Sequence, residues 1–198
     1  HGFELALAGV EHRPVVAVIG DSTFAHSGLS SLISTVYNQG VGTVCILDNR
    51  TTAMTGRQGN PFNGETLQKR PSREMDLIAV LGAIGVDNIA EVDPHDALAV
   101  RAALKKATRE EADALSVIVF KAPCVLLSRE RRAPYFVNGS CRSCGACTTL
   151  GCPAISKDAE TGVAAIDAAL CIGCGQCRQY CAFDAIEQLS QSALKGGR

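Results

Sequence analysis

The chain has 198 residues, 46% of them hydrophobic and 20% charged, and its formal net charge at pH 7 is −1. This composition allows one well-packed core with a small additional domain, and it gives no support for a nucleic-acid partner. No apolar run approaches the ~18 residues of a membrane-spanning helix, and no signal peptide is recognisable.

Residues 1–10 have the pattern of a helix already under way and include no initiating methionine, so we expect a longer protein of which this is the C-terminal part. From residue 14 onward, short apolar runs alternate with helical patterns. Continuous β-branched runs between helices predict an α/β domain with a parallel sheet buried on both faces. The predicted strands are 14–20, 42–48, 88–92 and 115–120, and the predicted helices are 26–38, 74–85 and 96–111, with a long polar loop at 49–71.

The chain divides into a first domain, a connector and a cysteine-rich domain. Residues 1–120 are expected to form the α/β domain. Residues 121–134 are rich in basic side chains, a composition more typical of a solvated connector than of a docking edge for another subunit or domain. Residues 135–190 predict a small α+β domain in which short apolar pieces at 135–137 and 185–186 surround the cysteines. Residues 191–198 are expected to be a frayed tail.

Eight of the ten cysteines fall into two copies of one pattern, which begin 30 residues apart (171 minus 141). A C-x2-C-x2-C run places three thiolates around an iron–sulfur cube, and in paired-cluster ferredoxins the fourth thiolate comes from the other repeat. We therefore predict a two-cluster ferredoxin-type domain. One [4Fe–4S] cluster would be held by Cys141, Cys144, Cys147 and Cys181, and the other by Cys171, Cys174, Cys177 and Cys152.

Two other uses of the cysteines are disfavoured. Zinc sites usually show isolated C-x2-C pairs rather than triplets, and a chain with this much apolar sequence needs no disulfides. The pattern departs from the usual ferredoxin run in two ways: four residues, 148–151, precede Cys152 where three are usual, and Ala182 stands where a proline is typical. Neither change removes a ligand.

A second site is predicted where the first two strands end. Gly20-Asp21-Ser22-Thr23 follows the first strand, and Asp48-Asn49-Arg50-Thr51 follows the second. If the strands are neighbours, Asp21 and Asn49 lie at one edge and can share an ion. Carboxylate and amide oxygens suit Mg²⁺, and a helix N-terminus suits a phosphate group. The alternative is an ordinary turn in which Asp21 only caps a helix.

The stretches 20–28 and 47–56 resemble the thiamine-diphosphate motif of the 2-oxoacid:ferredoxin oxidoreductase family, and within it the indolepyruvate branch. In that family a thiamine-diphosphate domain precedes a two-cluster ferredoxin domain, which is the order seen here. Ser22 replaces the second glycine of the usual Gly-Asp-Gly, as in the indolepyruvate branch. The resemblance implies that Mg²⁺ binds Asp21, Asn49 and the main-chain carbonyl of Thr51, that Gly20, Ser22 and Thr23 contact the diphosphate, and that Met54 and Thr55 lie near the thiazolium ring.

The resemblance also implies a reaction. Arylpyruvates such as indolepyruvate would be oxidatively decarboxylated to aryl-acetyl-CoA, with electrons passing through two clusters to an external ferredoxin. Independently of the resemblance, oxygen-sensitive clusters and reduced thiols indicate the cytoplasm. A β subunit and coenzyme A are the implied partners. The glutamate that activates the cofactor would come from a preceding domain, so we expect the chain to be inactive alone. Pyruvate or another 2-oxoacid as substrate, and an electron carrier without thiamine diphosphate, stay open as alternatives.

Three further residues carry weaker signals. His26 favours a local hydrogen bond at a helix start over contact with substrate or diphosphate. Cys45 lies in the middle of a predicted strand and is expected to be a buried apolar side chain. Cys124 belongs to neither repeat and is given no role.

Overall fold

The computed structural model describes residues 1–7, 14–109, 114–127 and 132–190. These residues form two compact units, His1–Leu127 and Ser128–Arg198. The expected tail at 191–198 lies outside the described residues, as do 128–131 of the connector and the last residues of two predicted helices, 8–10 and 110–111. In the part of the chain that is described, no helix combines the length and apolar composition needed to cross a membrane.

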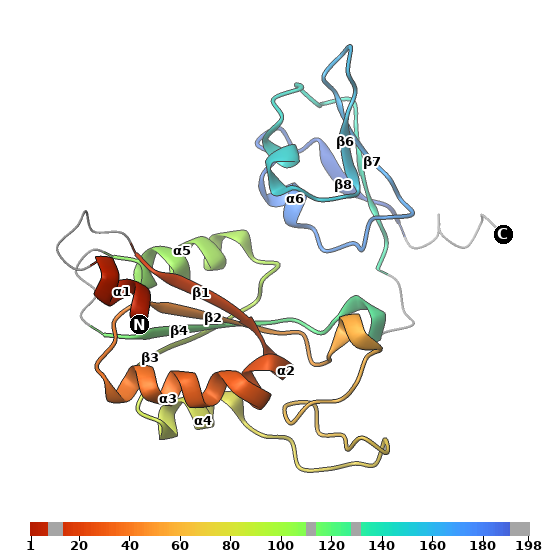
Figure 1. Ribbon diagram of the computed structural model, residues 1–198. Helices are drawn as coiled ribbons and strands as arrows, with labels where there is room; N and C mark the ends of the chain where they lie inside the picture. The colour runs from red at the N-terminus through yellow and green to blue at the C-terminus, as the bar shows by residue number, and fades with distance from the viewer. Residues whose placement is uncertain (8–13, 110–113, 128–131, 191–198) are drawn as a thin grey trace. The chain divides into compact units, whose positions relative to one another are not determined.

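The first unit is built on a parallel sheet of four strands, whose spatial order is β1-β2-β4-β3 (Figure 1). The predicted α/β class is confirmed, and each predicted strand is present within two residues at either end. The strands are β1 (Val16–Gly20), β2 (Thr43–Asp48), β3 (Asn88–Val92) and β4 (Ser116–Lys121).

Helices flank this sheet. Two of them begin where an aspartate side chain accepts free backbone N–H groups: Asp76 accepts from Ala79, and Asp96 accepts from Leu98 and Ala99. The helices of the first unit are α1 (Gly2–Leu7), α2 (Asp21–Thr23), the π-helix η1 (Phe24–Gly28), α3 (Leu29–Tyr37), α4 (Leu77–Ala83) and α5 (Ala97–Ala107), with 3-10 helices η2 (Ala53–Thr55) and η3 (Val125–Leu127).

The helix after β1 begins at Asp21, five residues before the predicted start at residue 26. Residues 20–23 include glycine, serine and threonine, which are weak helix formers, so the sequence pattern at this position predicts a turn. Gly28 explains how the helix approaches the strand, because a Cβ at this position would lie 2.6 Å from Ile19 Cδ1. A π-helical turn inside a helix is frequent near functional sites.

The two faces of the sheet are covered unequally. On one face, α3 and α4 enclose the main core, which includes Leu32, Ile46, Leu81 and Val117. On the other face, α5 packs over β2, β3 and β4 but not over β1.

The prediction of a buried first strand is therefore wrong. Val18 is 64% exposed and Val16 is 42% exposed, although both are apolar. Val16 pairs with Thr43 and Val18 pairs with Cys45, so both valines lie on the side of the sheet that α5 covers over the other strands. The apolar run predicted the strand correctly but not its burial, because β1 is the edge strand of the described sheet.

The long loop after β2 has its own short-range order. Thr52 and Gln58 form an antiparallel bridge around η2, and Glu65 and Pro71 form a second bridge. Phe62 anchors the loop in the core, where its ring stacks on that of Phe24 with centroids 6.5 Å apart.

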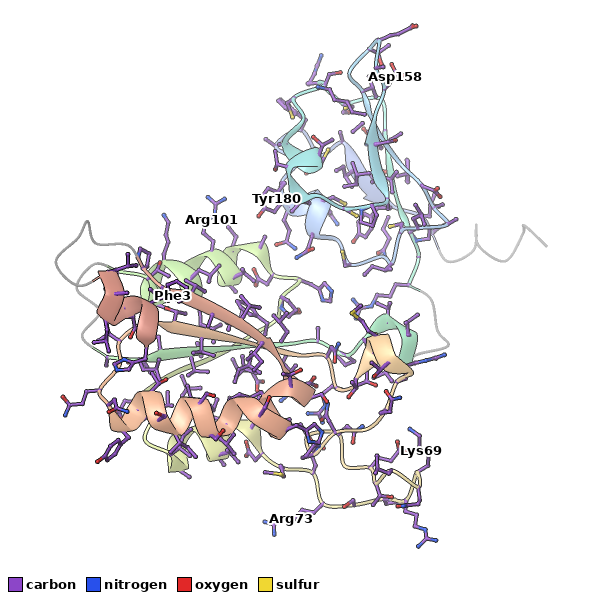
Figure 2. The ribbon with its side chains drawn as sticks, viewed as in Figure 1. Phe3, Lys69, Arg73, Arg101, Asp158 and Tyr180 are labelled. Atoms are coloured by element: carbon purple, nitrogen blue, oxygen red, sulfur yellow. The ribbon has the colours of Figure 1, made fainter. Side chains whose placement is uncertain are left out.

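The second unit holds two short antiparallel pairs. β5 (Tyr135–Val137) pairs with β8 (Ile186–Gln188), so the apolar pieces expected to pack around the cysteines form one small sheet. β6 (Ile155–Lys157) pairs with β7 (Ala164–Ile166) in a hairpin that the sequence analysis missed. The turn of this hairpin carries Asp158, which is labelled in Figure 2. The Asp158 carboxylate accepts the backbone N–H groups of Glu160 and Thr161.

The two cysteine repeats of this unit have the same local geometry. The 3-10 helix η4 (Ala146–Leu150) carries Cys147, and α6 (Gln176–Gln179) carries Cys177. Each helix follows a glycine with left-handed backbone, Gly145 at φ 74° and Gly175 at φ 76°. Glycine suits both positions because a side chain disfavours that conformation. The four residues before Cys152 are accommodated in η4 and its glycine cap.

Candidate cofactor site and cysteine clusters

Two polar segments meet at the carboxyl edge of the sheet. β1 and β2 are adjacent and Gly20 pairs with Leu47, so Asp21 and Asp48 follow at the same edge. The two strands are therefore neighbours, which is the condition that the sequence set for a shared ion site.

Asp21 is 2% exposed, and N–H groups from three segments hold its carboxylate. Oδ1 accepts the backbone N–H of Ser22 at 2.7 Å. Oδ2 accepts the backbone N–H of Arg50 at 3.1 Å and Nδ2 of Asn60 at 3.0 Å. A residue that only capped its own helix would need no partners 29 and 39 residues away. Asp21 therefore connects β1 to both ends of the loop that surrounds η2.

Asp48 is a second buried carboxylate beside Asp21, also 2% exposed, and the sequence analysis gave it no role. Burial is the largest cause that raises the pKa of Asp21. Hydrogen bonds from Asn60 and Ser22 act against that rise, and the charge of Asp48 adds to it. Two acidic side chains held side by side out of water attract a cation.

Arg50 joins the two carboxylates through its main chain. Its backbone N–H donates to Asp21 Oδ2 and to Asp48 Oδ1, both at 3.1 Å. The residue has a left-handed backbone with φ 64°, which is uncommon for a non-glycine residue and often marks a functional site. Its guanidinium is paired with Asp48 at 3.6 Å and with Glu74, so the side chain stays at this edge.

Asn49 and Thr51 lie in the same neighbourhood, since the flanking residues Asp48 and Arg50 both contact Asp21. Asn49 Oδ1 accepts the backbone N–H of Thr51 at 3.1 Å and keeps a second lone pair. Thr51 is buried, and its Oγ1 donates to the carbonyl of Gln58 at 3.3 Å. The candidate metal ligands at this edge are carboxylate, amide and main-chain carbonyl oxygens, and a set of oxygen ligands fits Mg²⁺.

The residues expected at the diphosphate lie around the end of β1. Among the described residues, no heavy atom lies within 4 Å of a Cβ built on Gly20, so there is open space at this position. Ser22 Oγ accepts the hydroxyl of Thr52 at 2.8 Å, and Thr23 is exposed in α2.

The residues expected near the thiazolium ring lie in η2. Thr55 Oγ1 donates to Gln58 Oε1 at 2.7 Å. Met54 is fully exposed, so a packing role for its side chain within the described unit is excluded.

Asn60 is a site residue that the sequence analysis missed. It is buried and contacts Asp21 directly. Its only sequence signal was an Asn-Pro turn dipeptide, which does not reveal a contact with a residue 39 positions earlier.

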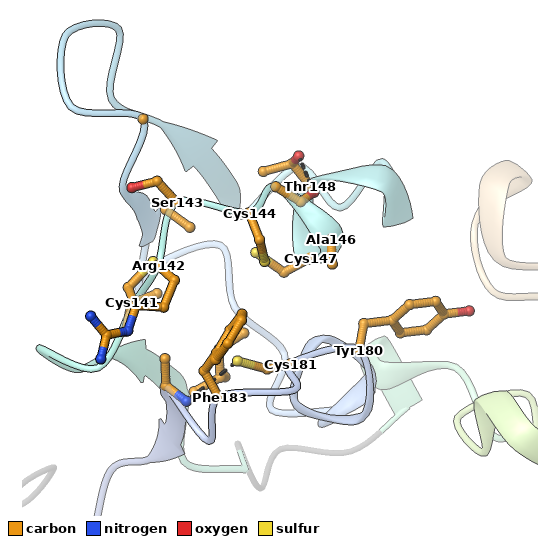
Figure 3. Close-up of a pocket in the computed structure, with 16 residues that line it drawn as sticks. Cys141, Arg142, Ser143, Cys144, Ala146, Cys147, Thr148, Tyr180, Cys181 and Phe183 are labelled. Carbon is orange, nitrogen blue, oxygen red and sulfur yellow. Dashed lines mark hydrogen bonds between the residues drawn. The ribbon is translucent and has the colours of Figure 1, made fainter.

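The first predicted cluster set lines one hollow of the second unit (Figure 3). Burial is the main cause that raises the pKa of Cys147 above its usual value, and nearby thiolate charges add to it. Those charges come from three cysteines, one of them 34 residues away (181 minus 147). The four thiols that share this neighbourhood are Cys141, Cys144, Cys147 and Cys181.

The second predicted set is gathered in the same way. Burial raises the pKa of Cys177 to about 11, with further contributions from the charges of Cys174, Cys171 and Cys152. Cys152 belongs to the first repeat in sequence, yet it lies with the second repeat in space. The charges that act on Cys147 and Cys177 therefore come from both repeats, and the assignment of the eight cysteines to two clusters stays a prediction.

Backbone N–H groups point at several of these sulfurs. Ala185 donates to Cys181 Sγ at 3.3 Å, and Tyr135 donates to Cys171 Sγ at 3.4 Å. Hydrogen bonds from Ala164 and Ser143 lower the pKa of Cys141. Such donors stabilise thiolates, and they tune the potential of clusters bound by them. The described residues contain no group of three or more His, Cys, Asp or Glu side chains that could hold a single metal ion. Two sets of four thiols with N–H donors fit iron–sulfur clusters.

The three remaining candidate residues have plain structural settings. Cys45 is buried in β2 as predicted, and burial raises the pKa of its thiol. His26 is exposed, and no hydrogen bond from its side chain to another described residue is found, so the predicted local bond is absent. The backbone N–H of Cys124 donates to the carbonyl of Asn49 at 3.0 Å, which places Cys124 at the same carboxyl edge of the sheet.

Two models of known families match parts of the chain. Residues 1–120 match the family described as thiamine pyrophosphate enzyme, C-terminal TPP binding domain. The chain belongs to the thiamine pyrophosphate enzyme family. Within this family member, residues 164–187 match a 4Fe-4S binding domain, a range that contains the second cysteine repeat.

The chain is also similar to curated proteins named indolepyruvate oxidoreductase subunit IorA, which confirms the resemblance to the indolepyruvate branch. It is 39% identical to that of Pyrococcus horikoshii over 98% of this chain and 32% of the relative. The identity to the protein of Thermococcus kodakarensis is 38%, over 96% of this chain and 32% of the relative. The identity to that of Archaeoglobus fulgidus is 34%, over 94% of this chain and 30% of the relative. The chain thus spans about a third of the length of the curated relatives it matches.

Proposed function

We propose that this chain is part of a 2-oxoacid:ferredoxin oxidoreductase that uses thiamine diphosphate. The observation that carries the proposal is the presence of two features in one chain. One is the pair of buried carboxylates, Asp21 and Asp48, at the carboxyl edge of the sheet, which we call the cofactor edge. The other is two groups of cysteines, each drawn from both repeats. Oxidative decarboxylation of a 2-oxoacid releases two electrons, and iron–sulfur clusters accept electrons one at a time. A chain with both sites can couple the two processes.

In this proposal Mg²⁺ is held by Asp21, Asn49 and the main-chain carbonyl of Thr51. The buried carboxylates and the oxygen-only donor set support this assignment. Thiamine diphosphate, when bound, supplies the carbanion and the electron sink that decarboxylation needs. The chain's own residues would bind and orient it: the open space at Gly20 would admit the diphosphate, Ser22 and Thr23 would contact it, and Met54 and Thr55 in η2 would lie near its reactive ring.

The cysteine-rich unit would carry electrons away through two [4Fe–4S] clusters. The crossed grouping of the thiols supports two cubes, because each repeat then contributes three ligands to one cluster and one ligand to the other. Cys147 and Cys177 are both buried, which would keep part of each cluster out of water, and burial is one of the factors that set the reduction potential.

We further propose that the substrate is an arylpyruvate such as indolepyruvate, converted to an aryl-acetyl-CoA. The names of the relatives support this choice. The specificity constants kcat/KM for indolepyruvate and pyruvate, measured in the assembled enzyme, decide the matter. A larger kcat/KM for pyruvate would overturn the arylpyruvate assignment and leave the 2-oxoacid reaction intact.

The proposed partners are a second subunit, an external ferredoxin and coenzyme A, and the proposed location is the cytoplasm. The relatives are each named as a subunit of an oxidoreductase, which supports a multi-subunit enzyme. The glutamate that activates the cofactor would come from outside this chain, so the chain should not turn over by itself.

The proposal is tested by the iron, sulfide and thiamine content of the intact protein purified without oxygen. We expect about eight irons per chain from two cubes, together with bound thiamine diphosphate. Zinc in place of iron would contradict the cluster assignment. Protein that never takes up thiamine diphosphate with Mg²⁺ would favour an electron carrier without that cofactor.

A further inference from the structure

Asn60 lies at the far end of the loop around η2, and its side chain reaches back to the end of β1. Nδ2 donates to Asp21 Oδ2 at 3.0 Å, and Oδ1 accepts the backbone N–H of Phe62 at 2.9 Å. The two partners fix the orientation of the amide, because a reversed amide would place its NH₂ group against another donor, the N–H of Phe62. Asn60 is buried, so neither bond competes with bulk water.

The main chain around Asn60 is anchored independently of Asp21. Phe62 is buried and stacks on Phe24, and the carbonyl of Pro61 accepts the backbone N–H of Met75 at 3.0 Å. The position of Asn60 is therefore fixed by the core, and its amide can hold the Asp21 carboxylate in one orientation.

The hydrogen bonds also decide which oxygen of Asp21 is available. Arg50 and Asn60 donate to Oδ2 and fill both of its acceptor positions. Oδ1 accepts the N–H of Ser22 and keeps a further position. Two donors on one oxygen stop the carboxylate from rotating. Because Arg50 and Asn60 flank η2, the same oxygen holds both ends of the loop that contains it.

We propose that Asn60 is a positioning residue that sets the Asp21 carboxylate for the divalent cation of the cofactor site. The inference rests on the proposed function, because the cation at Asp21 belongs to it. Without the Asn60 amide, only the N–H groups of Ser22 and Arg50 hold the carboxylate, so it is less constrained, and the loop loses one of its two hydrogen bonds to Asp21. Loss of a residue that orients a metal ligand typically weakens metal affinity about 10–100-fold.

The test compares Asn60→Ser with a matched control, Asn63→Ser. A serine hydroxyl can accept the N–H two residues on, so Asn60→Ser keeps the turn to Phe62 but cannot reach Asp21. Asn63 makes the same kind of turn, with Oδ1 accepting the N–H of Glu65 at 3.1 Å, and makes no bond to Asp21. The probe is Mn²⁺, whose binding to the intact protein with saturating thiamine diphosphate is followed by electron paramagnetic resonance.

We expect Asn60→Ser to raise the Kd for Mn²⁺ about 10–100-fold and Asn63→Ser to leave it unchanged. Saturating Mn²⁺ should restore thiamine diphosphate binding in Asn60→Ser, which a general folding defect would not allow. Should Asn60→Ser fail to fold, Asn60→Gln replaces it: its amide is displaced by one methylene, so a raised Kd is again expected.

Two negative outcomes are distinguishable. If the parent protein binds Mn²⁺ and the folded Asn60 variant binds it equally well, the positioning role is overturned and the proposed function stands. If the parent binds neither Mn²⁺ nor thiamine diphosphate, the proposed function fails, and the role of Asn60 fails with it.

Discussion

At the scale of single residues, the cofactor edge holds two carboxylates that would repel each other if nothing stabilised them. Backbone N–H groups of Ser22 and Arg50 and the amide of Asn60 stabilise Asp21 without a formal positive charge, whereas Asp48 accepts the backbone N–H of Arg50 and is paired with the Arg50 guanidinium. Asp21 and Asp48 thus stay available for a divalent cation, while the guanidinium of Arg50 is shared between Asp48 and Glu74. Hydrogen bonds orient the two carboxylates, and a bound cation would supply the positive charge that balances them.

The change Asp21→Asn tests the metal assignment. It removes the charge that would bind Mg²⁺ and replaces one oxygen with a donor that opposes other donors. We expect Mg²⁺-dependent binding of thiamine diphosphate, measured by calorimetry, to weaken by on the order of 100-fold or more, with iron content unchanged. Asp158→Asn, at the exposed turn of the second unit, is the control and should bind as the parent does. Parent-like affinity in Asp21→Asn would remove Asp21 from the metal site.

Part of this site could be predicted from sequence because strand ends in a parallel sheet share one edge. That rule places Asp21 and Asn49 together without any knowledge of the loop. Asp48 was missed because a strand-end aspartate reads as polar and exposed, whereas it is buried beside a like charge. Asn60 was missed because its contact depends on the path of a loop, which is fixed by the burial of Phe62 and not by a local pattern.

At the scale of elements, each helix contributes according to the face it covers. α4 buries Leu81 completely against the sheet, whereas Leu98 on α5 is 77% exposed. Leu81→Ala should therefore lower the free energy of unfolding by about 2–5 kcal/mol, because it leaves a cavity in the main core. Leu98→Ala should change it by less than about 0.5 kcal/mol. Urea unfolding followed by circular dichroism measures both, and equal losses would contradict the assigned core.

Strand periodicity predicted the sheet well but not the neighbours of β1. The run Val-Ala-Val-Ile is typical of a buried strand, yet Val18 is exposed because α5 packs over β2, β3 and β4 only. The β6–β7 hairpin was missed for another reason: its strands have three residues each, too few for a period of two to be recognised. The cysteine grouping, in contrast, is predicted from spacing alone, because ligation of an iron–sulfur cube constrains the spacing of its cysteines.

Crossed ligation makes a prediction for paired cysteine changes. Cys141→Ser with Cys181→Ser removes two ligands of one proposed cluster, so about four irons per chain should remain. Cys141→Ser with Cys152→Ser removes one ligand from each cluster, so both clusters should be lost or depleted. Iron and sulfide analysis of anaerobic preparations separates the two results. The opposite pattern, with iron kept in the second pair and lost in the first, would mean that each repeat holds its own fourth ligand.

At the scale of the whole molecule, carbon chemistry and electron transfer are assigned to different units of one chain, so each should fail separately. In the assembled enzyme carrying Asp21→Asn, dithionite should still bleach the iron–sulfur absorption, whereas a 2-oxoacid with coenzyme A should not. The reason is that the clusters depend on the cysteines, and the flow of electrons into them depends on the cofactor edge. The pair Cys141→Ser with Cys181→Ser should behave in the reverse way, binding thiamine diphosphate with parental affinity but transferring fewer electrons to ferredoxin. If substrate bleached the clusters of Asp21→Asn as fast as those of the parent, the acidic edge would not be where electrons enter the chain.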